Sequence, residues 1–135
     1  MEVFITVISG VSVYVLGQFT LKLIIEPIQE FKKEIAEIIN VIGFHANITS
    51  NPNMIDQEQS SEISKILRKH AINLESKSSI IPFYKMFENI RLLPKNENIE
   101  KASSELIGLS NSLYSSINGF ENYEKSSKIK KYLKI

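Results

Sequence analysis

The feature that most constrains this chain is a stretch of nineteen consecutive residues without a formal charge, at positions 3–21. Most of them are valine, isoleucine, phenylalanine or leucine, and the apolar character resumes after Lys22 and continues to Ile25. A helix that rises about 1.5 Å per residue over this stretch covers the roughly 30 Å hydrocarbon layer of a bilayer. The long side chain of Lys22 can place its ammonium among the headgroups while its stem stays in lipid. Residues 1–26 are therefore predicted to form a transmembrane anchor.

Two other interpretations compete with an anchor. A cleaved signal peptide has a basic start and a small-residue cleavage site, whereas this chain begins with Met1 and Glu2 and stays apolar through Ile24 and Ile25. A buried helix of a soluble protein is the second alternative, because polar residues dilute the stretch. They are Thr6, Ser9, Ser12, Gln18 and Thr20. A soluble core helix of this length is unusual, so the anchor is favoured.

The lysines predict the orientation of the span. Lys22, Lys32 and Lys33 follow the apolar stretch, and nothing basic precedes it apart from the α-amino group. Cytoplasmic segments next to a span carry the excess of lysine and arginine. The abundance of isoleucine, lysine, asparagine and serine is typical of an AT-rich bacterial genome. The predicted location is the bacterial inner membrane, crossed once, with the N-terminus outside and the C-terminus in the cytoplasm.

Small and hydroxyl-bearing residues gather on one face of the predicted span. Within about 100° around a helix lie Thr6, Gly10, Val13, Gly17 and Thr20. In lipid, small residues let two helix backbones approach closely. This face predicts contacts within a homo-oligomer. Glycine is also common in membrane helices, so an ordinary lipid-facing surface is the open alternative.

An amphipathic helix is predicted directly after the span. Apolar residues recur every three or four positions, at Ile28, Phe31, Ile35, Ile38 and Ile42. Charged residues lie between them, and Glu34 and Glu37 are counted with this polar set. Proline is tolerated in the first turn of a helix, so Pro27 either kinks the chain or leaves one nearly continuous helix. The turn-forming cluster at residues 49–53 is expected to end the helix near Ile48.

Further helices are predicted from the same periodicity, at residues 56–77, 82–93, 96–118 and 122–133. Asp56 is expected to cap the first of them, Pro82 to open the second and Gly119 to end the third. No segment alternates apolar and polar residues as a half-buried strand does. The predicted fold is all-α, with an N-terminal transmembrane helix followed by a cytoplasmic bundle of four to five helices. The cytoplasmic domain covers residues 27–121, and a lysine-rich C-terminal helix covers residues 122–135.

Composition and motifs argue against catalysis and against nucleic-acid binding. The 16 Lys and Arg balance 15 Asp and Glu, whereas nucleic-acid binding usually demands a clear basic excess. The sequence has no cysteine, no glycine-rich phosphate loop, no histidine–glutamate metal spacing and no nucleophile elbow. His45 and His70 are interpreted as core-edge histidines satisfied by a neighbour, and no motif supports a metal site with Glu37 or Glu75. No enzymatic activity, cofactor or metal is expected.

Three side chains are candidate contacts to a ligand or a cytoplasmic partner protein: Arg68, Tyr84 and Arg91. The chain has only these two arginines, and a guanidinium offers a planar fork that matches a carboxylate or a phosphate. Arg91 interrupts the apolar run at residues 90–93. It is therefore interpreted either as half of a structural ion pair or as part of a site for an anionic ligand.

The end of the chain is rich in lysine. Candidate contacts to lipid headgroups are Lys128, Lys130, Lys131 and Lys134. A lysine close to an anionic membrane surface contributes about 1 kcal/mol to binding. The alternative is the solvated last turn of a helix, where positive charge interacts favourably with the helix dipole.

Six short segments resemble a group of small bacterial membrane-anchored proteins. They are the Ile-Glu-Pro-Ile-Gln segment at 25–29, Ser-Asn-Pro at 50–52, Leu-Arg at 67–68, Ile-Pro-Phe-Tyr at 81–84, Arg-Leu-Leu-Pro at 91–94 and Glu-Leu-Ile-Gly-Leu-Ser-Asn at 105–111. The resemblance covers nearly the whole chain and implies the same layout, a single span followed by a helical domain. It implies no activity, because no established activity belongs to that group.

Two functions of different classes agree with these features. The first is a membrane-tethered, non-enzymatic interaction or sensing module that recruits a cytoplasmic partner. The alternative is an oligomeric, pore-forming or membrane-disrupting effector of a bacterial anti-phage defence system, assembled through the face that carries Gly10 and Gly17. An enzyme is the least favoured class, because the sequence holds no catalytic constellation.

Overall fold

The computed structural model describes residues 1–47, 56–114 and 119–134. Every regular element in these ranges is helical, so the all-α prediction is confirmed for the part of the chain that the structure describes. The predicted turn at residues 49–53 and the predicted helix end near Ile48 lie outside the described residues.

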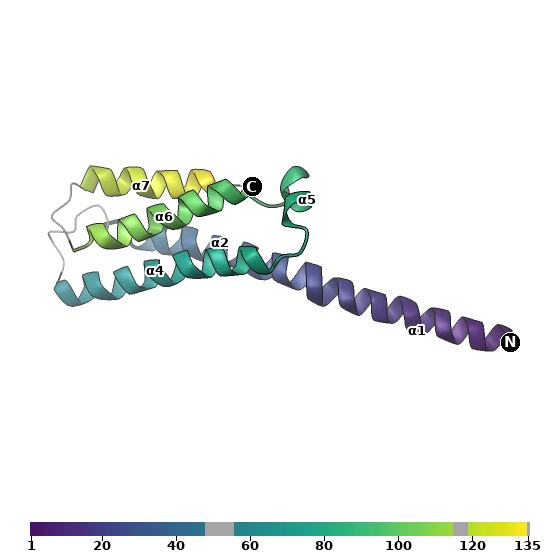
Figure 1. The fold of residues 1–135 in the computed structure, drawn as a ribbon. Helices are drawn as coiled ribbons and strands as arrows, with labels where there is room; N and C mark the ends of the chain where they lie inside the picture. Colours follow the sequence, from purple (N-terminus) through teal and green to yellow (C-terminus); the bar gives the residue numbers. More distant parts are fainter. Residues whose placement is uncertain (48–55, 115–118, 135) are drawn as a thin grey trace.

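A single long helix dominates the N-terminal third of the chain (Figure 1). It consists of α1 (Glu2–Thr20), a π-helical turn η1 (Leu21–Ile25) and α2 (Glu26–Phe44), which together run without a break for 43 residues. In the π-helical turn the backbone N–H of Glu26 donates to the carbonyl of Leu21, five residues back. The wider turn leaves room for the ring of Pro27, which has no N–H to donate. Pro27 therefore lies in the first turn of α2 without ending the helix.

The environment of this helix changes at its middle. Every side chain of α1 is exposed or partly exposed, and none is buried against the described part of the chain. From Ile28 onward α2 buries the stripe that its spacing predicts, namely Ile28, Phe31, Ile35, Ile38 and Ile42. The first half of this continuous helix thus packs against no other described part of the chain, whereas the second half contributes to the core.

Three more helices complete that core: α4 (Gln57–Ile80), α6 (Asn96–Ser112) and α7 (Gly119–Tyr132). Helix α4 packs against both α2 and α6, while α7 packs against α6 (Figure 1). Their buried side chains include Leu67, Ala71 and Leu74 of α4, Leu106 and Leu109 of α6, and Ile129 of α7. These apolar positions repeat every three or four residues, which places them on one face of each helix.

Two helix boundaries differ from the prediction around Gly119. Helix α6 ends at Ser112, and Gly119 begins α7 instead of ending α6. The hydroxyls of Ser110 and Ser112 donate to the carbonyls of Ile107 and Leu109, three residues back. Serine bonds of this kind compete with the backbone ladder of a helix, which favours an early end.

A short helix, α5 (Tyr84–Asn89), runs across the end of the packed helices from which α1 departs (Figure 1). It begins two residues later than Pro82, because Phe83 has a left-handed backbone with φ of 56°. Arg91, just after the helix, is also left-handed with φ of 59°. The two left-handed residues turn the chain on either side of α5 and set its direction.

Candidate functional site

The most unusual group in the core is the carboxylate of Glu34 on α2, whose side chain is only 1% exposed. The expectation that Glu34 belongs to the polar side of this helix is wrong. The residue lies three positions after Phe31 and four before Ile38, and this spacing puts it on the apolar stripe. The same spacing was the signal in the sequence that could have identified it.

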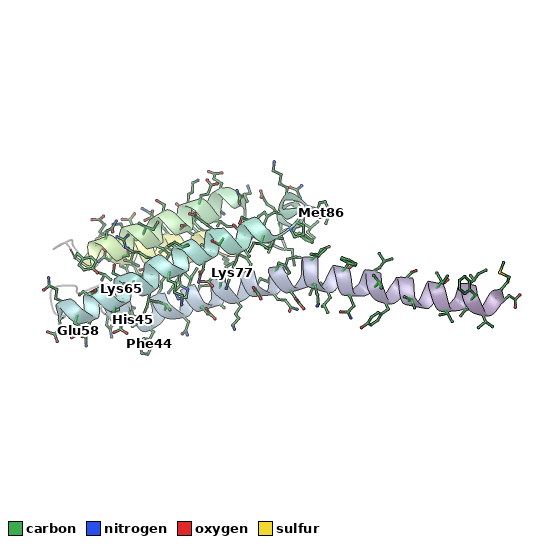
Figure 2. The ribbon with its side chains drawn as sticks, turned by 60° about the horizontal axis from the view of Figure 1, so that its bottom comes forward. Phe44, His45, Glu58, Lys65, Lys77 and Met86 are labelled. Atoms are coloured by element: carbon green, nitrogen blue, oxygen red, sulfur yellow. The ribbon has the colours of Figure 1, made fainter. Side chains whose placement is uncertain are left out.

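Glu34 is held by two side chains of α4. His70 Nδ1 lies 2.6 Å from Glu34 Oε1, and Lys77 Nζ donates to Glu34 Oε2 at 2.6 Å. His70 and Lys77 are seven residues apart, two helical turns, so both reach the same side of α4. We call these three residues the Glu34 cluster. Figure 2 shows Lys77 midway along the packed helices, in the region where α4 and α2 lie together.

The Glu34 cluster keeps the buried Glu34 carboxyl group ionised. Burial by itself raises the pKa of the Glu34 carboxyl, but hydrogen bonds and opposite charge from Lys77 and His70 outweigh this effect. The net result is a pKa below the ordinary value of 4.5. A charge taken out of water is tolerated when a partner pairs with it in this way. The cluster therefore links α2 to α4 through a buried charge that is paired on both oxygens.

The prediction of core-edge histidines is confirmed for His70, whose ring is satisfied by Glu34. The ring of His45 packs edge-on against Phe44, with centroids 5.0 Å apart.

The Glu34 cluster also contains the donor types that bind transition metals. Ligand atoms of Glu34, Glu37 and His70 lie within 4.8 Å of one another, and carboxylate and imidazole are ordinary zinc ligands. The second oxygen of Glu34 is already paired with the ammonium of Lys77, and Lys33 lies 3.9 Å from Glu37. These ammonium groups compete with a cation for the same carboxylates, so the arrangement favours an internal ion pair over a metal centre.

Two of the predicted contact residues take part in packing between elements. The guanidinium of Arg68 on α4 donates to the side-chain amide oxygen of Asn111 on α6. The hydroxyl of Tyr84 donates to the carbonyl of Pro94 at 2.8 Å, and its ring stands edge-on to Phe31 at 6.2 Å. Burial, followed by the charge of Glu88, raises the pKa of Tyr84 above its ordinary value.

The third predicted contact residue, Arg91, is exposed and forms no ion pair with the residues that the structure describes. It lines a shallow groove of about 270 Å³ together with Lys95 and Lys134. The structure thus brings together Arg91 and Lys134, which were predicted separately as contacts to a ligand and to lipid. Within the same tail Lys128 pairs with Glu124 at 2.9 Å, while the side chains of Lys130 and Lys131 are exposed.

The residues of the predicted oligomer face are exposed along α1. The hydroxyls of Thr6 and Thr20 donate to carbonyls of their own helix, four residues back, at 2.9 Å. A Cβ placed on Gly10 or Gly17 would meet no described atom within 4 Å. Val13 is exposed beside them. This face is open in the single chain.

Comparisons of this chain with protein-family models, with curated proteins and with solved structures find no match. The resemblance to small bacterial membrane-anchored proteins therefore stays a prediction from the six segments. In the residues that the structure describes, every regular element is helical and one helix, Glu2–Phe44, is long and apolar enough to cross a membrane by length and composition.

Proposed function

We propose that this chain is a membrane-tethered, non-enzymatic module whose packed helices recruit or sense a cytoplasmic protein. In this proposal residues 1–26 cross the bacterial inner membrane once, with the N-terminus outside. The observation that carries the proposal is the change of environment along one helix. Helix α1 leaves its large apolar side chains exposed, whereas α2 buries its apolar stripe in the core.

The surface of α1 favours lipid over water. Removing one valine, leucine, isoleucine or phenylalanine side chain from water contributes roughly 1.5–3 kcal/mol, and ten of these are exposed along α1. A helix also pairs its backbone N–H and C=O groups internally, as the hydrocarbon layer demands. The hydroxyls of Thr6, Ser9 and Thr20 bond to carbonyls of their own helix, so they bring no unpaired donor into lipid.

The tether is joined to the packed helices without a linker. Ile24, within the π-helical turn, already packs against the core, and Ile28 in the next turn is buried. A change in how α2 packs on α4 is therefore transmitted along a continuous helix to α1. This connection supports a sensing or recruiting role at the membrane, with the Glu34 cluster at the α2–α4 contact.

Single cysteines test the tether and its orientation, because the chain has no cysteine of its own. Val3→Cys marks the N-terminal end of α1, and Ser104→Cys marks an exposed position on α6. Intact cells are treated with a membrane-impermeant maleimide, and the labelled protein is quantified. Val3→Cys is expected to react in intact cells and Ser104→Cys only after lysis. Equal reaction of both positions in intact cells, or release of the protein from membranes by alkaline washing, would contradict the proposal.

The alternative function, an oligomeric pore-forming effector, draws support from one observation. The face with Gly10 and Gly17 is open along its length and carries hydroxyls that are already hydrogen-bonded. Small residues on such a face let a second copy approach closely in lipid. A single span with this face allows a pore only as a multimer.

We expect substitution of Gly10 and Gly17 by leucine to convert a multimer into a monomer, because the two side chains would hold neighbouring backbones apart. Light scattering of the full chain in detergent, corrected for bound detergent, measures the mass. Ile8→Leu combined with Val15→Leu is the matched control, because these two exposed positions lie on the opposite side of the helix. If the natural chain is already a monomer, α1 is an anchor alone and the pore hypothesis fails.

A further inference from the structure

Helix α5 and its flanks carry large apolar side chains that point away from the core. Ile80, Phe83, Met86 and Ile90 are exposed by 66%, 72%, 54% and 65%. We call these four residues the α5 face. On the opposite side of the same short helix, Phe87 is buried and Tyr84 packs against the core.

A surface segment that carries large apolar side chains on its buried side and also exposes four of them is unusual in water. A surface helix normally buries one apolar side and turns polar residues to the solvent. Contiguous exposed apolar side chains mark a contact with another protein or with a membrane. The position of the α5 face in the molecule decides between these two.

The α5 face lies at the end of the packed helices from which α1 departs, and both views agree on this (Figures 1 and 2). Figure 2 places Met86 at this end and Phe44 at the opposite one. The ring of Tyr84 contacts Phe31 of α2, six residues after Ile25. Six residues of helix correspond to about 9 Å, and the headgroup layer on each side of a bilayer is roughly 5–8 Å thick. When the long helix crosses the bilayer up to Ile25, the contact between α5 and Phe31 therefore lies at the outer edge of the headgroup layer.

The backbone around α5 holds the face outward. Phe83 and Arg91, the two non-glycine residues with positive φ in the described part of the chain, flank the helix on either side. The hydroxyl of Tyr84 donates to the carbonyl of Pro94 and ties the start of the segment to its end. Left-handed non-glycine residues persist where surrounding contacts determine the conformation. The backbone conformation of this segment is therefore fixed by its contacts, and its apolar side chains stay on the outside.

Charge near the α5 face matches an anionic lipid surface. Residues 80–95 contain three basic residues, Lys85, Arg91 and Lys95, against one acid, Glu88. Arg91 and Lys95 share a groove with Lys134 and with Glu88, so three cations and one carboxylate line it. A guanidinium binds phosphate through two donors, and lysines are attracted to anionic headgroups.

We propose that the α5 face is a second membrane contact, which seats in the headgroup layer of the bilayer that α1 crosses. Its apolar side chains enter the boundary between headgroups and acyl chains, as those of interfacial helices do. Arg91, Lys95 and Lys134 bind the phosphates of anionic lipids beside it. This proposal rests on the proposed function, because α1 delivers the α5 face to the surface. With two contacts the packed helices are held in one orientation at the membrane.

Fluorescence quenching by spin-labelled lipids tests the depth of α5 in the full chain. Single cysteines at Met86 and Ile90 carry an NBD fluorophore in vesicles of phosphatidylcholine and phosphatidylglycerol. Val15→Cys is the reference for the span, and Phe44→Cys is the matched control, an exposed apolar residue at the far end of the domain. We expect quenching at position 15 by deep nitroxides, quenching at 86 and 90 by shallow nitroxides, and no quenching at 44.

The outcomes separate this inference from the proposed function. Quenching at position 15 without quenching at 86 and 90 overturns the α5 contact and leaves the tether intact. No quenching at position 15 overturns the tether, whatever happens at α5. Protection of positions 86 and 90 from a water-soluble quencher without quenching by lipid indicates a protein partner on the α5 face and also overturns the inference.

Arg91→Gln, introduced into the Met86→Cys variant, tests whether Arg91 binds the phosphate of anionic lipids. Loss of one basic residue near an anionic surface is expected to lower the ratio of docked to undocked α5 about five-fold, the equivalent of ~1 kcal/mol. Lys65→Gln is the control, because Lys65 lies on α4 far from α5 (Figure 2). Equal quenching in both variants, or no loss when phosphatidylglycerol is omitted, overturns the assignment of Arg91 to lipid phosphate.

Discussion

Replacing Phe31 by alanine is expected to lower the free energy of unfolding of the packed helices by about 3–5 kcal/mol, as phenylalanine-to-alanine changes in cores do. Phe31 is completely buried on α2, and its ring meets the edge of Tyr84. The change leaves a cavity in the core where α2 meets α5. Urea unfolding of the full chain in detergent, followed by circular dichroism, measures the loss, because α1 stays helical in the micelle.

Phe44→Ala is the matched control for this experiment. Phe44 lies on the same helix and is 82% exposed, so its removal is expected to change the free energy of unfolding by no more than about 0.5 kcal/mol. Equal effects of the two substitutions would mean that α2 does not pack through the stripe that contains Phe31.

Lys77→Met has the second large expected effect, a loss of about 3 kcal/mol in the free energy of unfolding at neutral pH. Removing one partner of a buried ion pair costs about 3–5 kcal/mol, because the other charge is left without compensation. The lower figure applies here, since the Lys77 side chain is 30% exposed and His70 still contacts the Glu34 carboxylate. The same urea titration measures it.

Lys69→Met controls for the loss of a lysine on α4, because Lys69 is exposed and forms no ion pair within the described part of the chain. Its expected effect is within about 0.5 kcal/mol. In the combined Glu34→Gln and Lys77→Met variant the loss should be smaller than the sum of the two single losses, because the residues are in contact. Additive losses would contradict a coupled cluster.

The pH dependence of the Glu34 cluster provides a second readout. The pKa of Glu34 is lower in the folded chain than its ordinary value of 4.5, so the unfolded chain binds the proton more tightly. The stabilisation is therefore complete above about pH 4.5 and decreases as the pH falls through the lower folded pKa. The difference in free energy of unfolding between the natural chain and Glu34→Gln is expected to shrink in that acidic range. A difference that grows on acidification would contradict the assignment.

Periodicity predicted the helices because burial of one apolar side leaves a regular trace in the sequence. The stripe on α2 from Ile28 to Ile42 is buried as expected. The helix ends were less accurate. The hydroxyls of Ser110 and Ser112 bond to carbonyls near the end of α6, and the left-handed backbone of Phe83 moves the start of α5. These local backbone features are not evident from the residue types, so the predicted helix ends were off.

The candidate sites were harder to predict because they depend on pairs of residues distant in the chain. Glu34 occupies a stripe position of α2, and His70 and Lys77 lie at the edge of the stripe of α4, but their partnership arises only when α2 lies against α4. Arg91 and Lys134 are 43 residues apart and meet in one groove. The structure shows which apolar side chains around α5 are exposed, because it places Phe87 on the buried side of that helix.

By itself the sequence determined the all-helical class, the long apolar N-terminal helix and the apolar stripes, because these depend on the local order of side chains along a helix. The tertiary structure alone decided that Pro27 leaves the long helix unbroken, that the Glu34 carboxylate is paired with two side chains of α4, and that α5 lies beside the exit of α1. Each of these depends on contacts between segments far apart in the chain or on a backbone turn that several residues share. Such contacts have no local period, so only the packed structure displays them.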